Sequence, residues 1–200
     1  DNAPSRLFSD CPLIHACDHG YKDIAIMLMA AGADVNQEGD DEGMNGYGDK
    51  GSALLYALQS EHTEVAEFLL AAGADKTHHD DDGVTPLWLA AMTGNIKILK
   101  ILLADPDVNV NVQPNMQPSA LRIACDMEAY ETAHALARDP RIDQNGSGYR
   151  EYTRIRQRKR KRRERMMADQ LARQRLPPGL SRQHIKPNIG HLQDKTTLKF

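Results

Sequence analysis

Apolar and polar positions along the first 145 residues follow a pattern that occurs four times. Each copy has a short apolar segment of helical spacing, a polar break, a second apolar segment and a turn. In the second segments apolar residues recur at helical spacing, as at Val65, Phe68 and Leu69, which indicates one face turned to a core. The pattern predicts four helix–turn–helix units, near residues 11–36, 52–77, 85–111 and 119–145.

The period of the pattern supports a stacked arrangement. Successive copies are 41, 33 and 34 residues apart when measured at their second residues, Pro12, Ala53, Pro86 and Ala120. One unit of this size cannot bury its own apolar face, so neighbouring units must supply the core. A small residue stands at one place in every first segment, where it allows helices to approach closely. These residues are Ala16, Ala57, Ala90 and Ala124.

Residues typical of helix ends occur at matching places in the copies. Ser52, Thr85 and Ser119 stand directly before first segments, where N-caps are expected. Gly32 and Gly73 follow second segments, where a positive φ ends a helix. The boundaries of the predicted helices are therefore set by local chemistry as well as by periodicity.

The third copy reads TPLWLAAMTGNIKILKILL from Thr85, and the first copy ends in AAGADVN. These residues resemble the ankyrin repeat family, whose period is about 33 residues and whose signature is T-P-L-H-x-A. The resemblance covers about residues 11–145 and implies an all-α solenoid with β-turn fingers. The copies also depart from the family pattern. Glu61 replaces a usual glycine, and the turns ADPDVNVN and RDPRIDQN lack the Gly-Ala-Asp sequence.

Eight extra residues separate the first two copies, in the segment QEGDDEGMNGYGDKG between Gln37 and Gly51. Five glycines and five acidic residues predict a long, mobile, acidic finger. A calcium loop is an alternative, although the acidic residues do not follow the order of the twelve-residue EF-hand loop.

Composition narrows the function classes. The three cysteines are odd in number and lack the paired spacing of a zinc site or a disulfide framework, which favours an intracellular setting, cytoplasmic or nuclear. Apolar runs fall short of the roughly 20 residues that span a membrane, so no membrane partner is expected. The sequence also carries no phosphate loop or nucleophile elbow, so the prediction is a non-catalytic protein without a cofactor.

Two clusters offer alternatives that involve chemistry. The segment HHDDDG at 78–83 could bind a metal, but it also matches the finger between copies two and three, and we predict no metal site. A nucleophile and base could be built from His15 or His62 with Cys17 or Cys125. The cysteines fall at core positions, however, and a solenoid presents an open surface instead of a shaped pocket.

The resemblance implies that partners bind the concave surface formed by the fingers and the exposed edges of the first helices. Trp88 lies at the histidine position of the signature, and it either anchors a partner or packs on the next repeat. Acidic residues on this surface favour a basic protein partner. The predicted partner-binding residues are Asp18, His19, Gln59, Ser60, Asp80, Asp81, Val84, Trp88, Met92, Thr93, Asp126 and Met127.

The net charge of −3 hides two segments of opposite charge. Residues 1–149 hold 9 basic and 24 acidic residues, a net of −15, whereas residues 150–200 hold 16 and 4, a net of +12. We expect an ankyrin-like domain at 1–148, a basic helical extension at 149–176 and a disordered tail at 177–200. Tyr149, Tyr152 and Ile155 share one helical face, which predicts that the extension begins by docking on the fourth repeat.

The basic run RQRKRKRRER spans 156–165 and leaves several interpretations open. It could be a nuclear import signal read by an import receptor, or a site for nucleic-acid phosphates. It could also be a solvated helix that leads to another domain. A membrane-surface helix is disfavoured because no apolar face accompanies the charges. The cluster at its centre is Arg158, Lys159, Arg160, Lys161, Arg162 and Arg163.

Overall fold

Each of the four sequence repeats folds as one pair of helices. The computed structural model describes residues 11–40 and 50–174. In every pair a seven-residue first helix is followed by a turn and a second helix of eight or nine residues. The first helices are α1 (Pro12–Asp18), α3 (Ala53–Gln59), α5 (Pro86–Met92) and α7 (Ala120–Asp126). The second helices are α2 (Lys22–Ala30), α4 (Thr63–Ala71), α6 (Ile96–Leu103) and α8 (Tyr130–Arg138).

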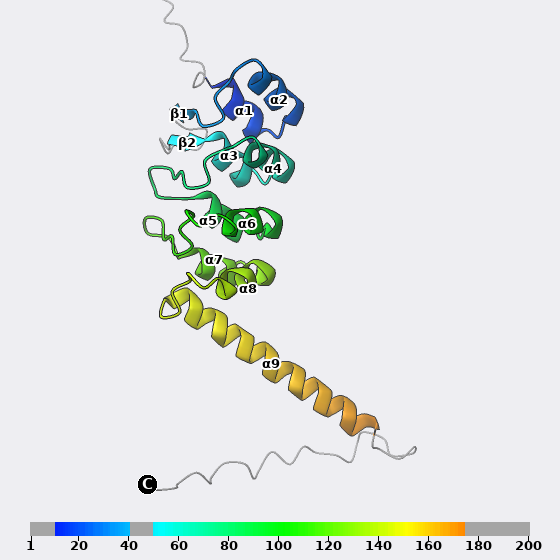
Figure 1. Cartoon of the computed structure of the whole chain (residues 1–200). Coiled ribbons are helices and arrows are strands. Elements are labelled where there is room, and N and C mark those ends of the chain that lie inside the picture. Colours follow the sequence, from blue (N-terminus) through cyan, green and yellow to red (C-terminus); the bar gives the residue numbers. More distant parts are fainter. Residues whose placement is uncertain (1–10, 41–49, 175–200) are drawn as a thin grey trace, which may run out of the picture. The chain divides into compact units, whose positions relative to one another are not determined.

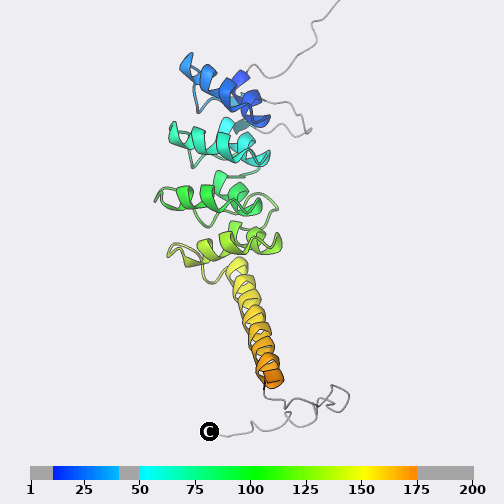
Figure 2. The same cartoon turned by 90° about the vertical axis from the view of Figure 1, so that its right-hand side faces the viewer.

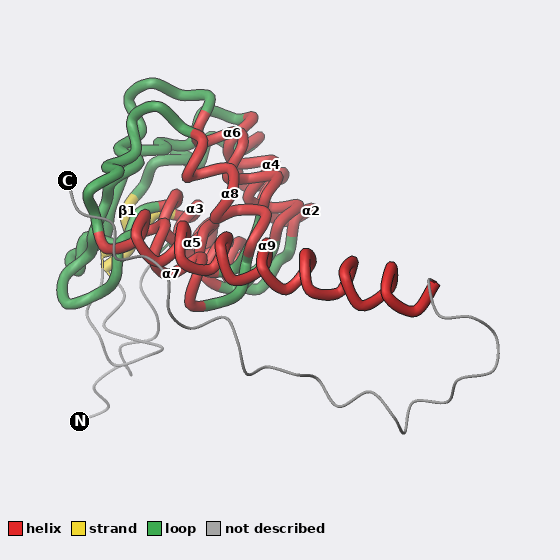
Figure 3. The backbone as a smooth tube through the Cα atoms, turned by 90° about the horizontal axis from the view of Figure 1, so that it is seen from below, coloured by secondary structure: helices red, strands yellow, loops and turns green. Residues whose placement is uncertain are grey.

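The helices form two layers (Figure 1). Each first helix contacts the first helix of the next repeat, and the second helices do the same in a layer beside them. The four pairs follow one another as tiers in Figure 2. Seen from below, the first helices lie between the second helices and the loops (Figure 3). The predicted all-α solenoid is therefore confirmed.

The core lies between the layers and between successive tiers. Each of the four alanines predicted to allow close approach is at most 3% exposed. On the second helices, Val65 and Ile98 are buried in this core, as are Leu69 and Leu102. Burial of apolar surface between tiers is the main favourable term, because a single helix pair has no core of its own.

The first repeat leaves uncovered a position that the later repeats bury. Ile24 corresponds in register to Val65 in α4 and to Ile98 in α6. Val65 and Ile98 are 2% and 0% exposed, whereas Ile24 is 48% exposed. Ile24 lies in the first of the four described helix pairs, and among the described residues no helix pair precedes it to cover this position.

Helix boundaries follow the predicted cap chemistry in part. The Thr85 hydroxyl accepts a hydrogen bond from the backbone N–H of Trp88 at 3.3 Å. Ser52 and Ser119 occupy the N-cap position without a side-chain cap bond. Gly32 and Gly73 adopt the predicted positive φ, 97° and 94°.

The turn inside each helix pair also requires a left-handed residue. Gly20 and Gly94 adopt φ of 73° there. Glu61 and Glu128 hold the same position in repeats two and four with φ of 60° and 57°. A non-glycine residue in this region carries strain of about 1–2 kcal/mol, so two of the four turns are locally strained.

A short two-stranded sheet stands at the base of the insertion between repeats one and two. β1 (Glu38–Asp40) pairs with β2 (Lys50–Ser52) in antiparallel register, with Gly39 opposite Gly51. A Cβ at Gly39 would lie 2.6 Å from the Ile14 side chain, and one at Gly51 would lie 2.7 Å from the Tyr56 ring. The segment predicted to be a long, mobile, acidic finger therefore has a strand pair at its base. Residues 41–49, on which the calcium alternative also depends, lie outside the described residues.

The basic extension begins as helix α9 (Ser147–Gln174). As predicted, Tyr149, Tyr152 and Ile155 pack against the core of the repeats. The Tyr152 hydroxyl lies 2.6 Å from His134 Nδ1. A Cβ at Gly148 would lie 2.9 Å from the backbone nitrogen of Arg122, so glycine lets the first turn of α9 approach α7.

The chain divides into two units, residues 1–156 and residues 157–200, and α9 contributes to both. The predicted helix end at 176 and the predicted disordered tail at 177–200 lie outside the described residues.

Candidate functional site

Four predicted pairs of binding residues occupy equivalent places, the last residue of each first helix and its C-cap. Repetition of one unit produces this row, because equivalent residues of stacked repeats lie along the same edge. The pairs are Asp18 with His19, Gln59 with Ser60, Met92 with Thr93, and Asp126 with Met127. The sequence therefore placed these eight residues on one edge of the solenoid.

Internal contacts engage several polar groups of this row. The Ser60 hydroxyl donates to Asp18 Oδ1 at 2.7 Å and links the first two repeats. Arg122 holds both carboxylate oxygens of Asp126 at 2.8 and 2.9 Å. The Thr93 hydroxyl donates to the Leu89 carbonyl. Four side chains of the row, those of Asp18, Ser60, Thr93 and Asp126, are thus used in internal contacts, which lowers the value of each as a recognition group.

The exposed members of the row include both polar and apolar side chains. Its exposed residues are His19, Gln59, Asp126 and Met127, whereas Met92 is half-buried. A flexible methionine beside polar groups is suited to an adaptable contact with a protein.

The finger between repeats two and three borders a hollow of about 450 Å³. His78 Nδ1 lies 3.7 Å from Glu38 Oε1, which connects this finger with the strand of the preceding one. The hollow is lined by Glu38, Thr77, His78, His79, Asp80 and Asp81. Its rim is acidic and open to solvent, so it offers carboxylates to a basic group.

Asp80 shapes the finger tip from within. Its Oδ1 accepts hydrogen bonds from the backbone N–H groups of Asp82 and Val84, at 3.0 and 2.8 Å. The Asp80 backbone N–H also donates to the Val84 carbonyl. Asp80 is therefore a turn-forming residue, and Asp81 and Asp82 present the exposed carboxylates of this finger.

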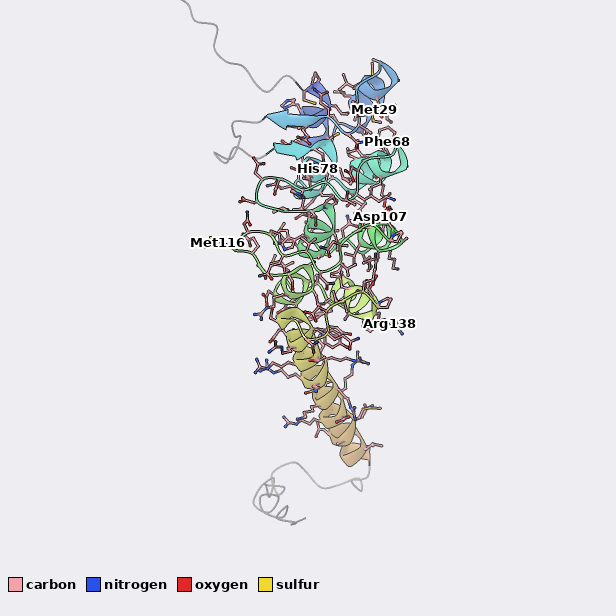
Figure 4. The ribbon with its side chains drawn as sticks, turned by 60° about the vertical axis from the view of Figure 1, so that its left-hand side comes forward. Met29, Phe68, His78, Asp107, Met116 and Arg138 are labelled. Atoms are coloured by element: carbon pink, nitrogen blue, oxygen red, sulfur yellow. The ribbon has the colours of Figure 1, made fainter. Side chains whose placement is uncertain are left out.

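The next finger is tied to this one. The backbone N–H of Asn115 donates to the Asp82 carbonyl at 2.7 Å, and the Asn115 side-chain amide reaches the Asp81 carbonyl at 3.5 Å. The residue that follows, Met116, is fully exposed and has φ of 54°. Figure 4 shows Met116 on the finger side, away from Met29 and Phe68 on the second-helix side.

Sequence reasoning missed Met116. The available signal was a methionine in the segment QPNMQP, where two prolines restrict the backbone of a polar turn. A single exposed apolar residue is common on protein surfaces. Met116 differs because a hydrogen-bonded and strained turn holds it outward beside two exposed carboxylates.

Trp88 belongs to the core. Its side chain is 6% exposed, and its Nε1–H donates to the Pro118 carbonyl at 2.8 Å. This contact links α5 to the segment that precedes α7. The packing alternative for Trp88 is therefore favoured over the role of partner anchor, and we remove Trp88 from the proposed surface.

The two alternatives that involved chemistry receive little support. Among residues 11–40 and 50–174, no group of three or more His, Cys, Asp and Glu side chains is arranged to hold a metal ion. Burial raises the pKa of the Cys17 thiol to about 12, and burial with the nearby Asp126 raises that of Cys125 to about 11. Both thiols are protonated at neutral pH and are poor nucleophiles.

The basic cluster at 158–163 is helical and exposed, as part of α9. Arg160 pairs with Glu164 at 2.8 Å. Within the part of the chain that the structure describes, no helix has both the length and the apolar character needed to cross a membrane.

Comparison with protein families gives one result that bears on the repeats. A family model described as ankyrin repeats in three copies matches residues 2–80 and again residues 54–146. The two matches overlap and together extend over all four helix pairs. No curated protein sequence matches the chain significantly.

Proposed function

Because the chain belongs to the ankyrin repeat family, we propose that it binds a protein partner along the edge formed by its fingers and the ends of its first helices. Members of this family generally mediate protein–protein interaction and are typically non-catalytic. The fold alone does not identify a partner, so the proposal depends on the surface itself.

The observation that carries the proposal is the tie between two neighbouring fingers. Its main hydrogen bond runs from the Asn115 N–H to the Asp82 carbonyl. This bond supports an exposed position of Met116 in the unbound protein. Preorganisation reduces the ordering cost of binding, so a rigid finger edge contributes more affinity than a mobile one.

The chemistry of the edge defines the partner. Asp81, Asp82 and Glu38 are exposed carboxylates, and Met116 is an exposed apolar residue on the finger that is hydrogen-bonded to Asp81 and Asp82. We expect a partner with an apolar pocket bordered by lysine or arginine. The exposed residues of the first-helix row, Gln59, Met127 and His19, extend the contact.

Affinity capture with the full chain tests this proposal. Proteins retained from a lysate are identified, and the affinity of each is then measured with purified components. Met116→Asp and Asp81→Arg should each weaken binding at least tenfold, because one removes the apolar contact and the other reverses a charge.

Met27→Asp provides the matched control. Met27 is also an exposed methionine, but it lies on α2, away from the fingers. Equal loss of affinity from Met27→Asp and Met116→Asp, or no loss from either finger variant, would contradict the assignment of the finger edge.

A further inference from the structure

Helix α9 carries a concentration of positive charge that the proposed protein-binding edge does not use. Every residue from 156 to 171 is exposed. This stretch contains eight lysines and arginines, all between Arg156 and Arg165, and two acidic residues, Glu164 and Asp169, which gives a net charge of 8 − 2 = +6.

The helical conformation sorts these cations into two sets. With 3.6 residues per turn, residues at spacings of three, four and seven lie on one face. One set is Arg156, Lys159, Arg160 and Arg163. The other set is Arg158, Lys161, Arg162 and Arg165. The two sets, named here stripe one and stripe two, have the same spacing and lie on nearly opposite faces of the helix.

Two stripes are unusual for a helix that rests on a flat surface. A membrane-surface helix needs one apolar face and one charged face. In α9 the exposed apolar residues Met166, Met167 and Leu171 all follow the basic run and do not form a face along it. Like charges at spacings of four residues also repel one another within each stripe, which a surrounding polyanion would relieve.

The major groove of B-form DNA has the geometry that two opposite stripes require. The groove is about 12 Å wide and admits one α-helix, with a phosphate backbone along each wall. Each stripe extends over eight residues, about 10 Å along the helix. The net charge of +6 on this stretch can neutralise about six phosphates, about three along each wall of the groove.

We propose that the basic run of α9 binds duplex DNA by lying in the major groove, with one cationic stripe on each phosphate backbone. The cations contact phosphates instead of base edges, so binding is independent of sequence. An import receptor that binds its signal as an extended peptide would require two to three turns of α9 to unwind. The major groove of DNA can bind the same residues as an intact helix.

Salt dependence gives the first test. Binding of the full chain to a labelled 20-base-pair DNA duplex is followed by fluorescence anisotropy between 50 and 200 mM salt. Release of counterions from about six phosphates predicts a slope of about −5 in log K against log salt, a loss of about 10³-fold over this range. A slope shallower than about −2 would refute the six-phosphate contact.

Two quadruple variants test the groove geometry. Glutamine replaces the four cations of stripe one, or the four of stripe two, because glutamine retains helix propensity without charge. Each variant should reduce the slope to about −3, and the combination of both should abolish measurable binding at 200 mM salt. If one variant abolishes binding while the other matches the unaltered chain, only one face contacts DNA and the groove placement is wrong.

A control with the same change in charge uses cations of the repeats: Lys22, Lys97, Lys100 and Arg138, all replaced by glutamine. This variant should keep the slope near −5. Circular dichroism of every variant verifies that the helix content is unchanged.

Duplex RNA distinguishes the groove from phosphate attraction alone. The major groove of A-form RNA is deep and narrow, so the helix cannot enter it. Binding to a 20-base-pair RNA duplex should be at least tenfold weaker than to DNA. Equal or tighter binding to RNA overturns the proposal. So does unchanged DNA binding by both stripe variants with loss of nuclear accumulation in cells, which would identify the run as an import signal.

Discussion

Arg141 joins the last two repeats through one guanidinium group. Its side chain donates to both carboxylate oxygens of Asp139, at 3.0 and 2.8 Å. It also donates to four backbone carbonyls at the end of α6 and in the turn that follows, those of Leu103, Asp105, Pro106 and Val108. This turn lacks the glycine that ends the second helices of repeats one and two. Arg141 therefore supplies donors for carbonyls that a helix end leaves unpaired.

The cost of Arg141→Ala can be worked from these contacts. The pair with Asp139, whose side chains are 31% and 9% exposed for Arg141 and Asp139, contributes about 1.5 kcal/mol, at the lower end for hydrogen bonds to charged groups. The four carbonyl contacts reach partly solvated oxygens and contribute about 0.5 kcal/mol each. The expected loss is therefore about 3.5 kcal/mol in the free energy of unfolding, a large part of the 5–15 kcal/mol typical of a domain.

Urea unfolding of the full chain measures this loss by circular dichroism and by the fluorescence of Trp88, the only tryptophan. Trp88 lies in α5 of repeat three, the repeat whose closing turn Arg141 holds, so its transition should shift with the helix signal. Arg141→Lys keeps the charge but not the planar fork, and it should recover less than half of the loss. Arg138→Ala, at an exposed arginine three residues earlier, should cost less than about 0.5 kcal/mol. A loss below about 1 kcal/mol for Arg141→Ala, or full recovery with lysine, would refute this reasoning.

Three further predictions concern stability. Glu61→Gly should raise the free energy of unfolding by about 1 kcal/mol because it relieves the left-handed strain at φ 60°; an equal gain in Glu61→Ala would assign the effect to the side chain instead. Ile98→Ala should cost about 3 kcal/mol by leaving a cavity, whereas Ile24→Ala should cost less than about 1 kcal/mol. Equal costs at these matched positions would show that Ile24 is covered in solution. The Arg141 hydrogen bond lowers the pKa of Asp139 below its ordinary value. The stabilisation is therefore present above about pH 4 and is lost as the pH falls through the lowered pKa. Consequently, the difference between the unaltered chain and Arg141→Ala should shrink in urea titrations below pH 4.

The candidate site was only partly visible in the sequence. The first-helix pairs could be placed in a row because the period of the repeat puts equivalent residues on one edge. The same period could not show that Ser60 binds Asp18 or that Arg122 neutralises Asp126, since those contacts depend on side-chain direction across or along helices. Their assignment to partner binding stays a prediction.

Finger residues were harder still to assign. Asp80 and Asp81 are adjacent residues of the same type. The Asp80 carboxylate accepts a hydrogen bond within its own turn, whereas Asp81 is exposed. The exposed position of Met116 depends on a hydrogen bond between two fingers, from Asn115 to Asp82, which are 33 residues apart in the chain. Such contacts cannot be read from local pattern, because they form only when the tiers stack.

The sequence by itself determined the repeating architecture. Helical periodicity, the small residues at Ala57 and Ala90 and the helix-ending glycines Gly32 and Gly73 act within one repeat or between equivalent positions, so pattern is enough to predict them. Tertiary structure alone decided what lies between the repeats. In the folded stack Trp88 is buried and Ile24 is exposed. Arg141 holds a turn that has no glycine, through hydrogen bonds to its carbonyls. The physical reason is that burial and hydrogen bonding depend on which tier is adjacent, and adjacency exists only in the folded stack.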